Sequence, residues 1–318
     1  MENSNIENTY DVIVIGGGPA GLTAGIYLSR AKVKTLVLNE GTAGGQMVLT
    51  HEIANYPGVE SINGYQLSNI MKKQALSFGC TVKANVKITS LNISGDEKTV
   101  EVNGKDVYKA SAIVLATGGR SRTIGVPGED KFKGMGISYC ATCDGDFFQD
   151  KDIIVVGGGN SALEEAVSLT KYASSVTVVH QFDHFQAFES AISEAKANPK
   201  INFLMESEIQ EFHGENSLES VTIKNMRTCD LYEKKIDGTF ILIGYVPSTE
   251  KVKDLVELNE RNEIVTDENM KTNIEGVFAA GDSREKRYRQ VTTAVSDGTI
   301  AALSAVEYLE GIKKPIAV

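Results

Sequence analysis

Two cysteines separated by two residues, Cys140 and Cys143 in the segment YCATCDG, are the residues of this sequence best suited to chemistry. Cysteines at this spacing can form a reversible disulfide, or they can supply half of a zinc site. A zinc site of this kind needs a second cysteine or histidine pair close in sequence, and the nearest such pair, His180 and His184, begins 37 residues after Cys143. A reducing cytosol makes a purely structural disulfide unexpected. We therefore predict a redox-active pair.

The position of this pair also favours reactivity. Two intervening residues place the sulfurs within disulfide reach at the start of a helical turn, where backbone N–H groups lower a thiol pKa. Asp144 follows directly and is a candidate proton donor or acceptor, although an aspartate there can also be a helix N-cap. Cys80 and Cys229 are isolated in apolar or mixed segments and are predicted to be unreactive.

A glycine-rich turn near the start of the chain indicates a dinucleotide-binding fold. The apolar run Asp11–Ile15 leads into GGGPAG at Gly16–Gly21, with Pro19 just inside a helix that continues through Ala24 to Ser29. A second strand, Thr35–Leu38, then ends at Asn39-Glu40. The GxGxxG pattern alone is a weak signal, but its setting of strand, turn, helix and strand makes it a strong one.

The same arrangement occurs a second time. Asp152–Val156 is a predicted strand, GGGNSA at Gly157–Ala162 is the turn, Leu163–Tyr172 a helix and Ser175–Val179 the next strand. Ala162 replaces the last glycine of the motif, a change that still allows close packing of helix on strand. Two dinucleotide folds in one chain suggest that one coenzyme donates electrons and the other receives them.

Composition agrees with a soluble protein of about two domains. The 318 residues are 42% hydrophobic and 23% charged, with a formal net charge of −10. The acidic balance disfavours nucleic acid and anionic membrane surfaces as partners. No apolar run suggests a membrane span, and the polar N-terminus does not resemble a signal peptide. We expect a cytoplasmic protein.

Two further predicted strands end in glycine and complete the domain organisation. Ala112–Ala116 leads into Thr117-Gly118-Gly119, and Gly276–Ala280 leads into Gly281-Asp282. The expected fold is α/β, with two Rossmann-like dinucleotide-binding domains of the three-layer ββα type, the second inserted in the first. The first domain is predicted to comprise residues 1–121 and 250–318, and the inserted redox domain residues 122–249. The joints are expected near residues 120–124 and 244–248, where a shared hinge would allow rigid rotation.

Taken together, the motifs resemble those of the low-molecular-weight thioredoxin reductases over essentially the whole chain. They occur in the family's order: GGGPAG, GGQ, ATG, GVPGE, YCATCDG, GGGNSA, FILIGYVP and AAGD...RQ. The resemblance implies FAD on the first fold, a homodimer, and thioredoxin as the partner that is reduced. It also implies that Cys143 exchanges electrons with the flavin, that Cys140 attacks thioredoxin, and that Asp144 handles the proton.

The resemblance also implies which residues meet FAD. Gly16, Gly18 and Gly21 are expected at the pyrophosphate, and Asn39 or Glu40 at the adenosine ribose, although the family often has Glu where Asn39 aligns. Further residues are expected along the same cofactor, with Gly281 and Asp282 near the ribityl-phosphate region and Arg289 and Gln290 at the isoalloxazine end; the others are Gly44, Gly45, Gln46, Thr117 and Gly118.

One family motif is missing from the second fold. Arginines that grip the NADPH 2′-phosphate would align with Gln181, Phe182 and Gln186, and the strand ends at His180 instead of an acidic residue that would read NAD. Three lost charge-assisted hydrogen bonds would cost about 4–9 kcal/mol. Phe182, Phe185 and Phe188 could be core residues at helical spacing, which would close the site, and Asp183 is expected to begin a helix. We predict that the NADPH site is lost.

Without NADPH, electrons must come from another donor. FAD accepts electrons singly or in pairs, so a one-electron iron–sulfur donor is chemically compatible. The sequence is similar to the ferredoxin-dependent flavin thioredoxin reductases of clostridia-like anaerobes, which lack the NADPH-reading motif. Reduced ferredoxin is therefore the expected donor. A positive docking patch would be needed, and the densest basic cluster is Arg284, Lys286, Arg287 and Arg289, with Lys313-Lys314 a weaker candidate. Cofactor binding and dimer contacts are an equally good explanation of this basic run, because much of it resembles ordinary thioredoxin reductases.

Three other functions remain open at this stage. The first is an NADPH- or NADH-dependent thioredoxin reductase with an atypical pocket, because Gln and His can bind a ribose and the GGGNSA turn is intact. The second is a ferredoxin–NADP reductase, which would need no CATC pair. The third is a flavin-bearing redox sensor without turnover, against which the intact Cys140, Cys143 and Asp144 argue.

Overall fold

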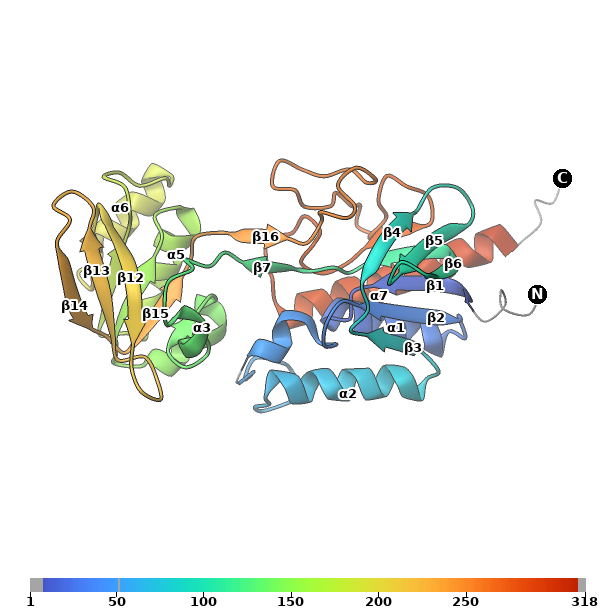
Figure 1. The fold of residues 1–318 in the computed structure, drawn as a ribbon, viewed down its shortest axis with the longest axis horizontal. Coiled ribbons are helices and arrows are strands. Elements are labelled where there is room, and N and C mark those ends of the chain that lie inside the picture. Colours follow the sequence, from blue (N-terminus) through green and yellow to red (C-terminus); the bar gives the residue numbers. More distant parts are fainter. Residues whose placement is uncertain (1–7, 51, 314–318) are drawn as a thin grey trace. The chain divides into compact units, whose positions relative to one another are not determined.

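The computed structural model describes residues 8–50 and 52–313. The chain divides into two compact units, which Figure 1 shows as a ribbon. Unit 1 comprises residues 1–120 and 246–318, and unit 2 comprises residues 121–245, so the second is inserted in the first. In the described ranges, no helix is long and apolar enough to cross a membrane.

Unit 1 is built on a sheet in the order β3-β2-β1-β6-β5-β4, with β17 also paired to β6. The strands β3, β2, β1, β6 and β17 are parallel, while β5 and β4 extend the sheet in antiparallel fashion. The long strand β6 pairs with β5 along its first half and with β17 along its last residues. The strands are β1 (Thr9–Ile15), β2 (Thr35–Asn39), β3 (Thr81–Ala84), β4 (Ile88–Asn92), β5 (Lys98–Val102), β6 (Asp106–Leu115) and β17 (Val277–Ala279).

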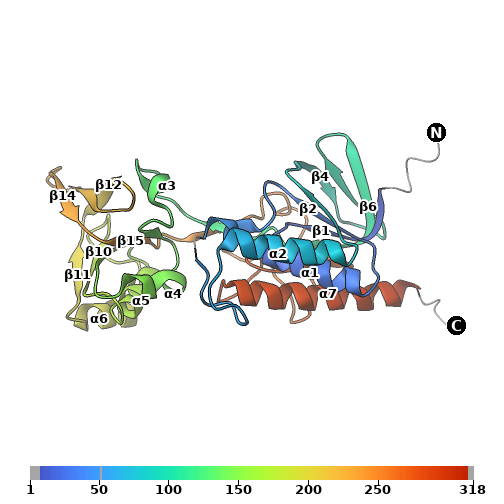
Figure 2. The same cartoon turned by 90° about the horizontal axis from the view of Figure 1, so that it is seen from below.

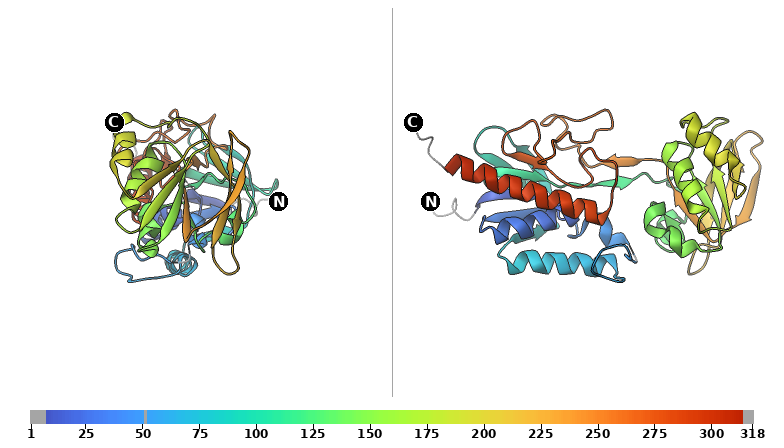
Figure 3. Two further views of the ribbon diagram at one scale, coloured as in Figure 1. Left: turned by 90° about the vertical axis from the view of Figure 1, so that its left-hand side faces the viewer. Right: turned by 180° about the vertical axis from the view of Figure 1, so that it is seen from behind.

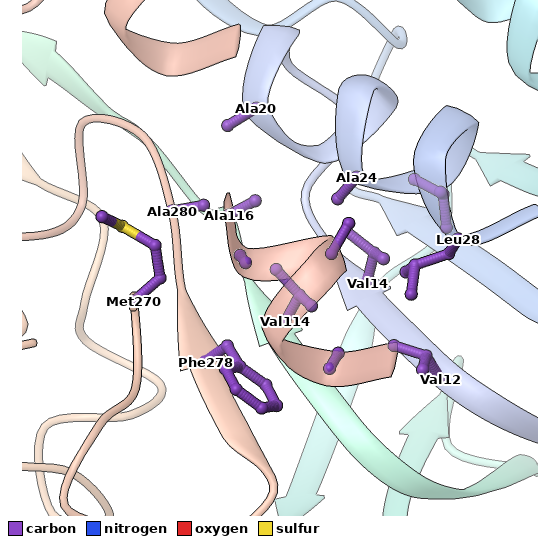
Figure 4. Packing of buried hydrophobic residues seen from close by; sticks show 14 of the residues in the cluster. Val12, Val14, Ala20, Ala24, Leu28, Val114, Ala116, Met270, Phe278 and Ala280 are labelled. Atoms are coloured by element: carbon purple, nitrogen blue, oxygen red, sulfur yellow. The ribbon is translucent and has the colours of Figure 1, made fainter. Parts of the chain in front are cut away.

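Helix α1 (Pro19–Arg30) is flanked by α2 (Gly64–Ser77) and by the long α7 (Val291–Lys313), as Figures 2 and 3 show. Alternate residues of β1 point to opposite faces of the sheet. Val12 and Val14 pack in the cluster shared with α1 and α7, shown in Figure 4, and the next residue along, Ile15, belongs to the cluster on the other face. The sheet is therefore buried on both sides, which explains why β1 is a continuous apolar run.

Unit 2 contains a parallel sheet in the order β11-β10-β9-β15-β8 and an antiparallel sheet in the order β12-β13-β14. The strands are β8 (Ile137–Ser138), β9 (Asp152–Val156), β10 (Ser175–Val179), β11 (Ile201–Leu204), β12 (Ser207–His213), β13 (Ser220–Asn225), β14 (Leu231–Lys235) and β15 (Gly238–Ile241). The α-helices are α3 (Glu129–Phe132), α4 (Ala141–Asp144), α5 (Asn160–Leu169) and α6 (Glu189–Ala197). Two 3-10 helices complete the elements, η1 (Gly45–Leu49) in unit 1 and η2 (Gly145–Phe148) in unit 2.

The two connections between the units are short strands that pair with each other. They are β7 (Gly119–Ser121) and β16 (Tyr245–Pro247), which run side by side in Figure 1. Directly after β7, the buried Glu129 of α3 accepts hydrogen bonds from Ile124 N (3.1 Å), Gly125 N (2.6 Å) and the hydroxyl of Tyr139 (2.7 Å). Burial and this carboxylate raise the pKa of Tyr139. The Glu129 side chain thus links the segment after β7 to Tyr139, the residue before Cys140.

Replacing Glu129 is expected to destabilise the protein strongly. Glu129→Ala leaves two backbone N–H groups and a hydroxyl without their acceptor, at a cost of about 3–5 kcal/mol in the free energy of unfolding. Glu129→Gln keeps one carbonyl oxygen as acceptor and should cost less. Urea unfolding of the full chain measures both. The matched control is Asp130→Asn, an exposed carboxylate on the same short helix, expected to change the stability by less than about 0.5 kcal/mol. Equal effects of both positions would contradict the role given to Glu129.

The predicted elements agree with the structure in most places. Asp152–Val156 and Ser175–Val179 are strands as predicted, and Pro19 is the first residue of α1. The helix after the second glycine turn is Asn160–Leu169 and not Leu163–Tyr172, because Gly159 is its extended N-cap and the chain turns after Thr170. The strands β4, β5 and β12 to β14 were not predicted, since their antiparallel pairing carries no glycine motif.

Candidate functional site

The residues predicted to bind FAD gather at one edge of the sheet in unit 1. The strands β2, β1, β6 and β17 are neighbouring and parallel, so their carboxyl ends lie together. Ligands of open α/β sheets bind at such an edge. The residues that follow these four strands are, in sheet order, Glu40 after β2, Gly16 and Gly18 after β1, Thr117 and Gly118 after β6, and Gly281 and Asp282 after β17. Asn39 is the last residue of β2.

The first glycine turn leaves no room for a side chain at its first glycine. At Gly16, φ is +110° and a Cβ would lie 2.0 Å from the carbonyl oxygen of Ala116. The GGQ segment approaches the same turn, since Gly44 N donates to Gly17 O (2.6 Å) and a Cβ on Gly45 would lie 3.2 Å from the Cα of Gly18. Gln46 follows in η1 and is exposed. The structure thus brings GGQ and GGGPAG together, and their contact with a cofactor stays a prediction.

Asn39 and Glu40 have different environments. The buried Asn39 accepts from Gly17 N (2.7 Å), and its amide donates to the carbonyl oxygens of Gly41 (2.9 Å) and Thr42 (3.0 Å). Both of its N–H donors are therefore used in holding the loop. Glu40 is partly exposed, accepts from Ile88 N (2.9 Å) and pairs with Lys251. Of the two residues, Glu40 is the better placed to accept hydrogen bonds from a ribose.

Three buried polar atoms in the segments after β6 and β17 have no hydrogen-bond partner among the described residues. They are Thr117 Oγ1, Asp282 Oδ1 and Ser283 Oγ. An unpaired polar group in the interior is costly, which indicates that a ligand completes Thr117 and Asp282. Burial raises the pKa of Asp282, while Lys286 and Arg289 lower it. The glycine cradle together with these polar atoms fits the pyrophosphate and the hydroxylated ribityl chain of FAD.

The segment before α7 corrects the predicted docking patch. Lys286 Nζ lies 2.7 Å from Asp297 Oδ2, Arg284 lies 3.5 Å from Asp297 Oδ1, and Arg289 pairs with Glu263. Three of the four basic side chains are thus ion-paired within unit 1, with Arg284 and Lys286 sharing Asp297, and only Arg287 is exposed without an ion pair among the described residues. The cluster serves internal pairing, so it offers no strongly positive surface. Gln290 accepts from Asn55 Nδ2 (3.4 Å), Lys314 lies outside the described residues, and nothing is described of the side chain of Lys313.

In unit 2, Cys140 and Cys143 form a disulfide across the first turn of α4, with their Cα atoms 5.3 Å apart. Cys140 is the N-cap of this helix, and its sulfur accepts from Cys143 N (3.2 Å). The N–H group favours negative charge on the Cys140 sulfur, because a thiolate accepts a stronger hydrogen bond than a thiol does. The predicted redox pair is therefore formed, and Cys140 is the sulfur better prepared to be a thiolate.

Asp144 lies at the end of the same turn. Its Oδ2 accepts from the hydroxyl of Ser138 (2.5 Å), and the same Ser138 oxygen accepts from Cys140 N (3.1 Å). Burial raises the pKa of Asp144, with a smaller opposing effect of Ser138. Asp144 does occupy the N-cap position of η2, as the alternative has it, but its side chain makes no capping bond there. A carboxyl held close to the disulfide, with its proton retained more easily than usual, suits proton transfer.

Asp144→Asn is expected to stabilise the fold while slowing catalysis. The pKa of Asp144 in the folded protein is raised above its ordinary value of 3.8. Below pH 3.8 the protonated carboxyl therefore contributes stability, which is lost as the pH rises through the raised pKa. At neutral pH the carboxylate therefore costs stability that Asn does not. Thermal unfolding between pH 4 and 8 should show a higher Tm for the variant only at the upper end. Thioredoxin reduction should fall about 10²-fold; a lower Tm at pH 8 would contradict this account.

Glu165 also belongs to this site, although sequence reasoning did not identify it. Its Oε2 accepts from Ala141 N (3.0 Å), which places a half-buried carboxylate of α5 at the residue after Cys140. Burial raises its pKa, and the bond from Ala141 lowers it. The contact spans 24 residues, and no local sequence pattern marks it.

The other two cysteines lie apart from this turn. Cys80 is buried, and burial raises its pKa to about 11, which agrees with the prediction that it is unreactive. Cys229 is exposed, so its predicted lack of reactivity stays a prediction. Among the described residues, no group of three or more His, Cys, Asp or Glu side chains could hold a metal ion.

The second glycine turn is covered on one side by the chain that follows β10. The imidazole of His180 lies directly over Gly158, where an added Cβ would meet its ring atoms at 2.4–2.5 Å. Gln186 N donates to Gly158 O (2.8 Å), and Phe188 N donates to the side chain of Asn160 (2.7 Å). Nε2 of His180 donates to the carbonyl of His184 (3.1 Å), and burial lowers the pKa of His180. This histidine is therefore neutral at physiological pH.

The predictions for the aromatic residues of this segment were largely wrong. Residues 181–188 form no helix, and α6 begins only at Glu189, so Asp183 does not begin a helix. Phe182 and Phe188 are 39% and 71% exposed and are not core residues. Only Phe185 packs against a core cluster, and it stacks on His180 at 5.9 Å between ring centroids. The helical spacing of the phenylalanines gave a wrong prediction because hydrogen bonds from this segment to Gly158 and Asn160 hold its backbone in bends.

The chain is similar to known proteins over almost its whole length. Residues 10–298 match the model of the family described as pyridine nucleotide-disulphide oxidoreductase. The chain is 47% identical over 305 residues to a 34.2 kDa protein in the rubredoxin operon of Clostridium pasteurianum, covering 96% of this chain and 99% of that protein. It is 46% identical over 312 residues to a thioredoxin reductase of Peptoclostridium acidaminophilum, with 96% and 98% covered. The crystal structure of thioredoxin reductase from Streptococcus pyogenes is similar at a TM-score of 0.93 and 40% identity, covering 97% of this chain and 100% of that one.

Proposed function

Because this chain belongs to the thioredoxin reductase family, we propose that it reduces thioredoxin with electrons from reduced ferredoxin instead of NADPH. The electrons pass through FAD and the Cys140–Cys143 disulfide. We also propose that it acts as a cytoplasmic homodimer, as the family resemblance implies.

The observation that carries the choice of donor is the chemistry of the segment after β10. From His180 to Phe188 there is no lysine or arginine, and the one charged carboxylate, Asp183, would repel a phosphate. His180 is buried and neutral, so it supplies no positive charge either, and His184 already pairs with Asp183 (Nδ1–Oδ1 2.6 Å). A bound 2′-phosphate would therefore have no lysine or arginine of this segment as its partner. Each missing charge-assisted hydrogen bond would contribute about 1.5–3 kcal/mol to its binding.

Energetics permit the alternative donor. A low-potential ferredoxin near about −400 mV and a thioredoxin dithiol near about −270 mV differ by about 130 mV. For two electrons this difference corresponds to roughly 6 kcal/mol in favour of thioredoxin reduction. Two molecules of a one-electron donor are needed for each disulfide. FAD, when bound, supplies the conversion between single electrons and an electron pair.

The residues at the edge of the unit 1 sheet are proposed to contact different parts of FAD. Gly16 and Gly18 form the cradle for the pyrophosphate, Thr117 and Asp282 complete their hydrogen bonds on the cofactor, and Glu40 accepts from the adenosine ribose. Gly21, Gly45, Gln46, Gly118, Gly281, Arg289 and Gln290 are the remaining residues proposed to line the same cofactor.

The thiol exchange is carried by the cysteines and Asp144. The Cys140 thiolate attacks one sulfur of the thioredoxin disulfide, forming a mixed disulfide and releasing a thioredoxin thiolate. Cys143 then attacks the Cys140 sulfur, which restores the Cys140–Cys143 bond and releases reduced thioredoxin. Two electrons leave the reductase, and the two thiol protons pass to thioredoxin. Asp144 is proposed to hold and release a proton beside the sulfurs, with Ser138 fixing its carboxylate at 2.5 Å.

A second function has a specific observation in its favour. The turn Gly157–Ala162 is intact and is followed by the ten-residue helix α5, so a pyrophosphate could still be bound at its N-terminus. This would make the protein an NADPH- or NADH-dependent reductase with an atypical pocket. The two functions differ in the donor and share the disulfide chemistry.

Turnover of thioredoxin separates them. Reduction of thioredoxin is followed anaerobically with NADPH, with NADH, or with ferredoxin kept reduced by dithionite; dithionite without ferredoxin is the control. We expect turnover that saturates with ferredoxin and less than about one hundredth of that rate with either nucleotide, as the lost contacts require. Nucleotide turnover equal to the ferredoxin rate would favour the second function.

A further inference from the structure

Glu165 occupies a position next to the redox pair that the mechanism above does not use. Three backbone N–H groups open the turn that carries the disulfide, and each has a different acceptor. Cys140 N donates to Ser138 Oγ (3.1 Å), Ala141 N to Glu165 Oε2 (3.0 Å) and Cys143 N to the Cys140 sulfur (3.2 Å). Glu165 thus holds the N–H group of Ala141. In the chain this group lies between the N–H of Cys140, which contacts Ser138, and the N–H of Cys143, which contacts the Cys140 sulfur.

The carboxylate reaches this place from a different element. It lies on α5, whose residues Leu163, Ala166 and Leu169 are buried in the core of unit 2. The helix is therefore held firmly, and the side chain of Glu165 is aimed at a fixed point. Ala141 itself is buried in the same cluster. The hydrogen bond joins two packed elements, so it has a defined geometry.

The charge of Glu165 has a chemical consequence for the disulfide. Reduction adds two electrons to the Cys140–Cys143 bond and creates negative charge on sulfur whenever a thiolate is formed. The carboxylate holds the Ala141 N–H, and its own negative charge opposes a thiolate nearby. Asp144, Asp146 and Glu164 are the other acidic groups around this turn, and no ion pair to Glu165 exists in the described part of the chain that would cancel its charge.

We propose that Glu165 is a positioning residue that anchors the first turn of the redox motif and makes the Cys140–Cys143 dithiol a stronger reductant. A group that disfavours the reduced, partly ionised form shifts the equilibrium towards the disulfide, so the dithiol gives up its electrons more readily. The inference rests on the thioredoxin reductase function and not on the choice of electron donor.

The test is the redox equilibrium of the pair in the purified holoprotein. Wild type, Glu165→Gln and Glu164→Gln are equilibrated anaerobically with mixtures of reduced and oxidised dithiothreitol, alkylated, and analysed by mass spectrometry. In this exchange the protein disulfide gains two electrons and two protons from dithiothreitol, which is oxidised to its cyclic disulfide. The assay contains neither ferredoxin nor nucleotide, so its outcome is independent of the donor.

Glu165→Gln keeps an oxygen for Ala141 N but removes the charge. We expect its equilibrium to move about fivefold towards the dithiol, which corresponds to about 20 mV. Glu164→Gln removes an exposed charge from the same helix and should move it less than about twofold, since exposed charges are well screened. Glu165→Ala should show the shift and a lower kcat for thioredoxin, which Glu165→Gln should largely restore. An unchanged equilibrium in Glu165→Gln, or the same shift in Glu164→Gln, would overturn the proposal. Far-ultraviolet circular dichroism confirms folding, and if the alanine variant does not fold, the two glutamine variants decide.

Discussion

Cys143→Ser is expected to lose thioredoxin reduction by at least about 10³-fold while its Cys140 still forms a mixed disulfide with thioredoxin. Both cysteines are half-buried, so burial alone does not separate their roles. The hydrogen bond from Cys143 N to the Cys140 sulfur does, because it stabilises a thiolate on Cys140. The Cys140→Ser protein should lose turnover equally and should form the mixed disulfide far more slowly.

The measurement uses a thioredoxin that retains only its attacking cysteine, activated with Ellman's reagent. Attack by a reductase thiolate releases the coloured thionitrobenzoate and leaves a covalent complex, which non-reducing electrophoresis detects. Since the thioredoxin variant has no second thiol, the complex cannot resolve. The double variant lacking both cysteines is the control for reaction at Cys80 or Cys229. Faster complex formation by Cys140→Ser than by Cys143→Ser would reverse the two roles.

Restoring three arginines after β10 is expected to give the protein an NADPH site. Gln181, Phe182 and Gln186 are all exposed, so arginines there need not be buried without a counter-charge. Each charge-assisted hydrogen bond to the 2′-phosphate contributes about 1.5–3 kcal/mol, so even two of them would raise NADPH affinity about 10²-fold or more. The triple arginine variant should therefore bind NADPH far better than wild type does, and much better than it binds NADH.

Titration calorimetry with NADP⁺ and NAD⁺ measures this gain. A triple alanine variant at the same positions is the control, because it loosens the segment over Gly158 without adding charge. Binding gained equally by the alanine variant would mean that the aromatic segment excludes the nucleotide sterically. Tight NADP⁺ binding by wild type would mean that the segment reads the phosphate without arginine, and the proposed loss of the site would be wrong.

Features encoded by contiguous residues could be predicted from the sequence. Ile153 to Val156 form an uninterrupted apolar run, as expected for a strand buried on both faces, and Gly157 marks its end. The CATC spacing likewise determines that a disulfide can close across one helical turn. In each case, residues adjacent in sequence are enough to define the geometry.

Features that depend on distant partners could not be predicted. The basic cluster before α7 resembles a docking patch until Asp297 and Glu263 are found beside Lys286 and Arg289. Glu165 and Glu129 gain their roles only when α5 and α3 are packed near Cys140 and Tyr139. The phenylalanines after His180 have a helical spacing, but the backbone bond from Gln186 to Gly158 holds the segment in another conformation.

Reduction of the flavin distinguishes the two electron donors before thioredoxin is involved. The purified yellow protein is mixed anaerobically with NADPH, with NADH, or with reduced ferredoxin, and its absorbance is followed in a stopped-flow instrument. We expect reduced ferredoxin to bleach the flavin fast and neither nucleotide to bleach it on the time scale of turnover. Thioredoxin added to the ferredoxin-reduced protein should then reoxidise the flavin. Fast bleaching by NADPH or NADH, with no faster reaction for ferredoxin, would contradict the proposed choice of donor.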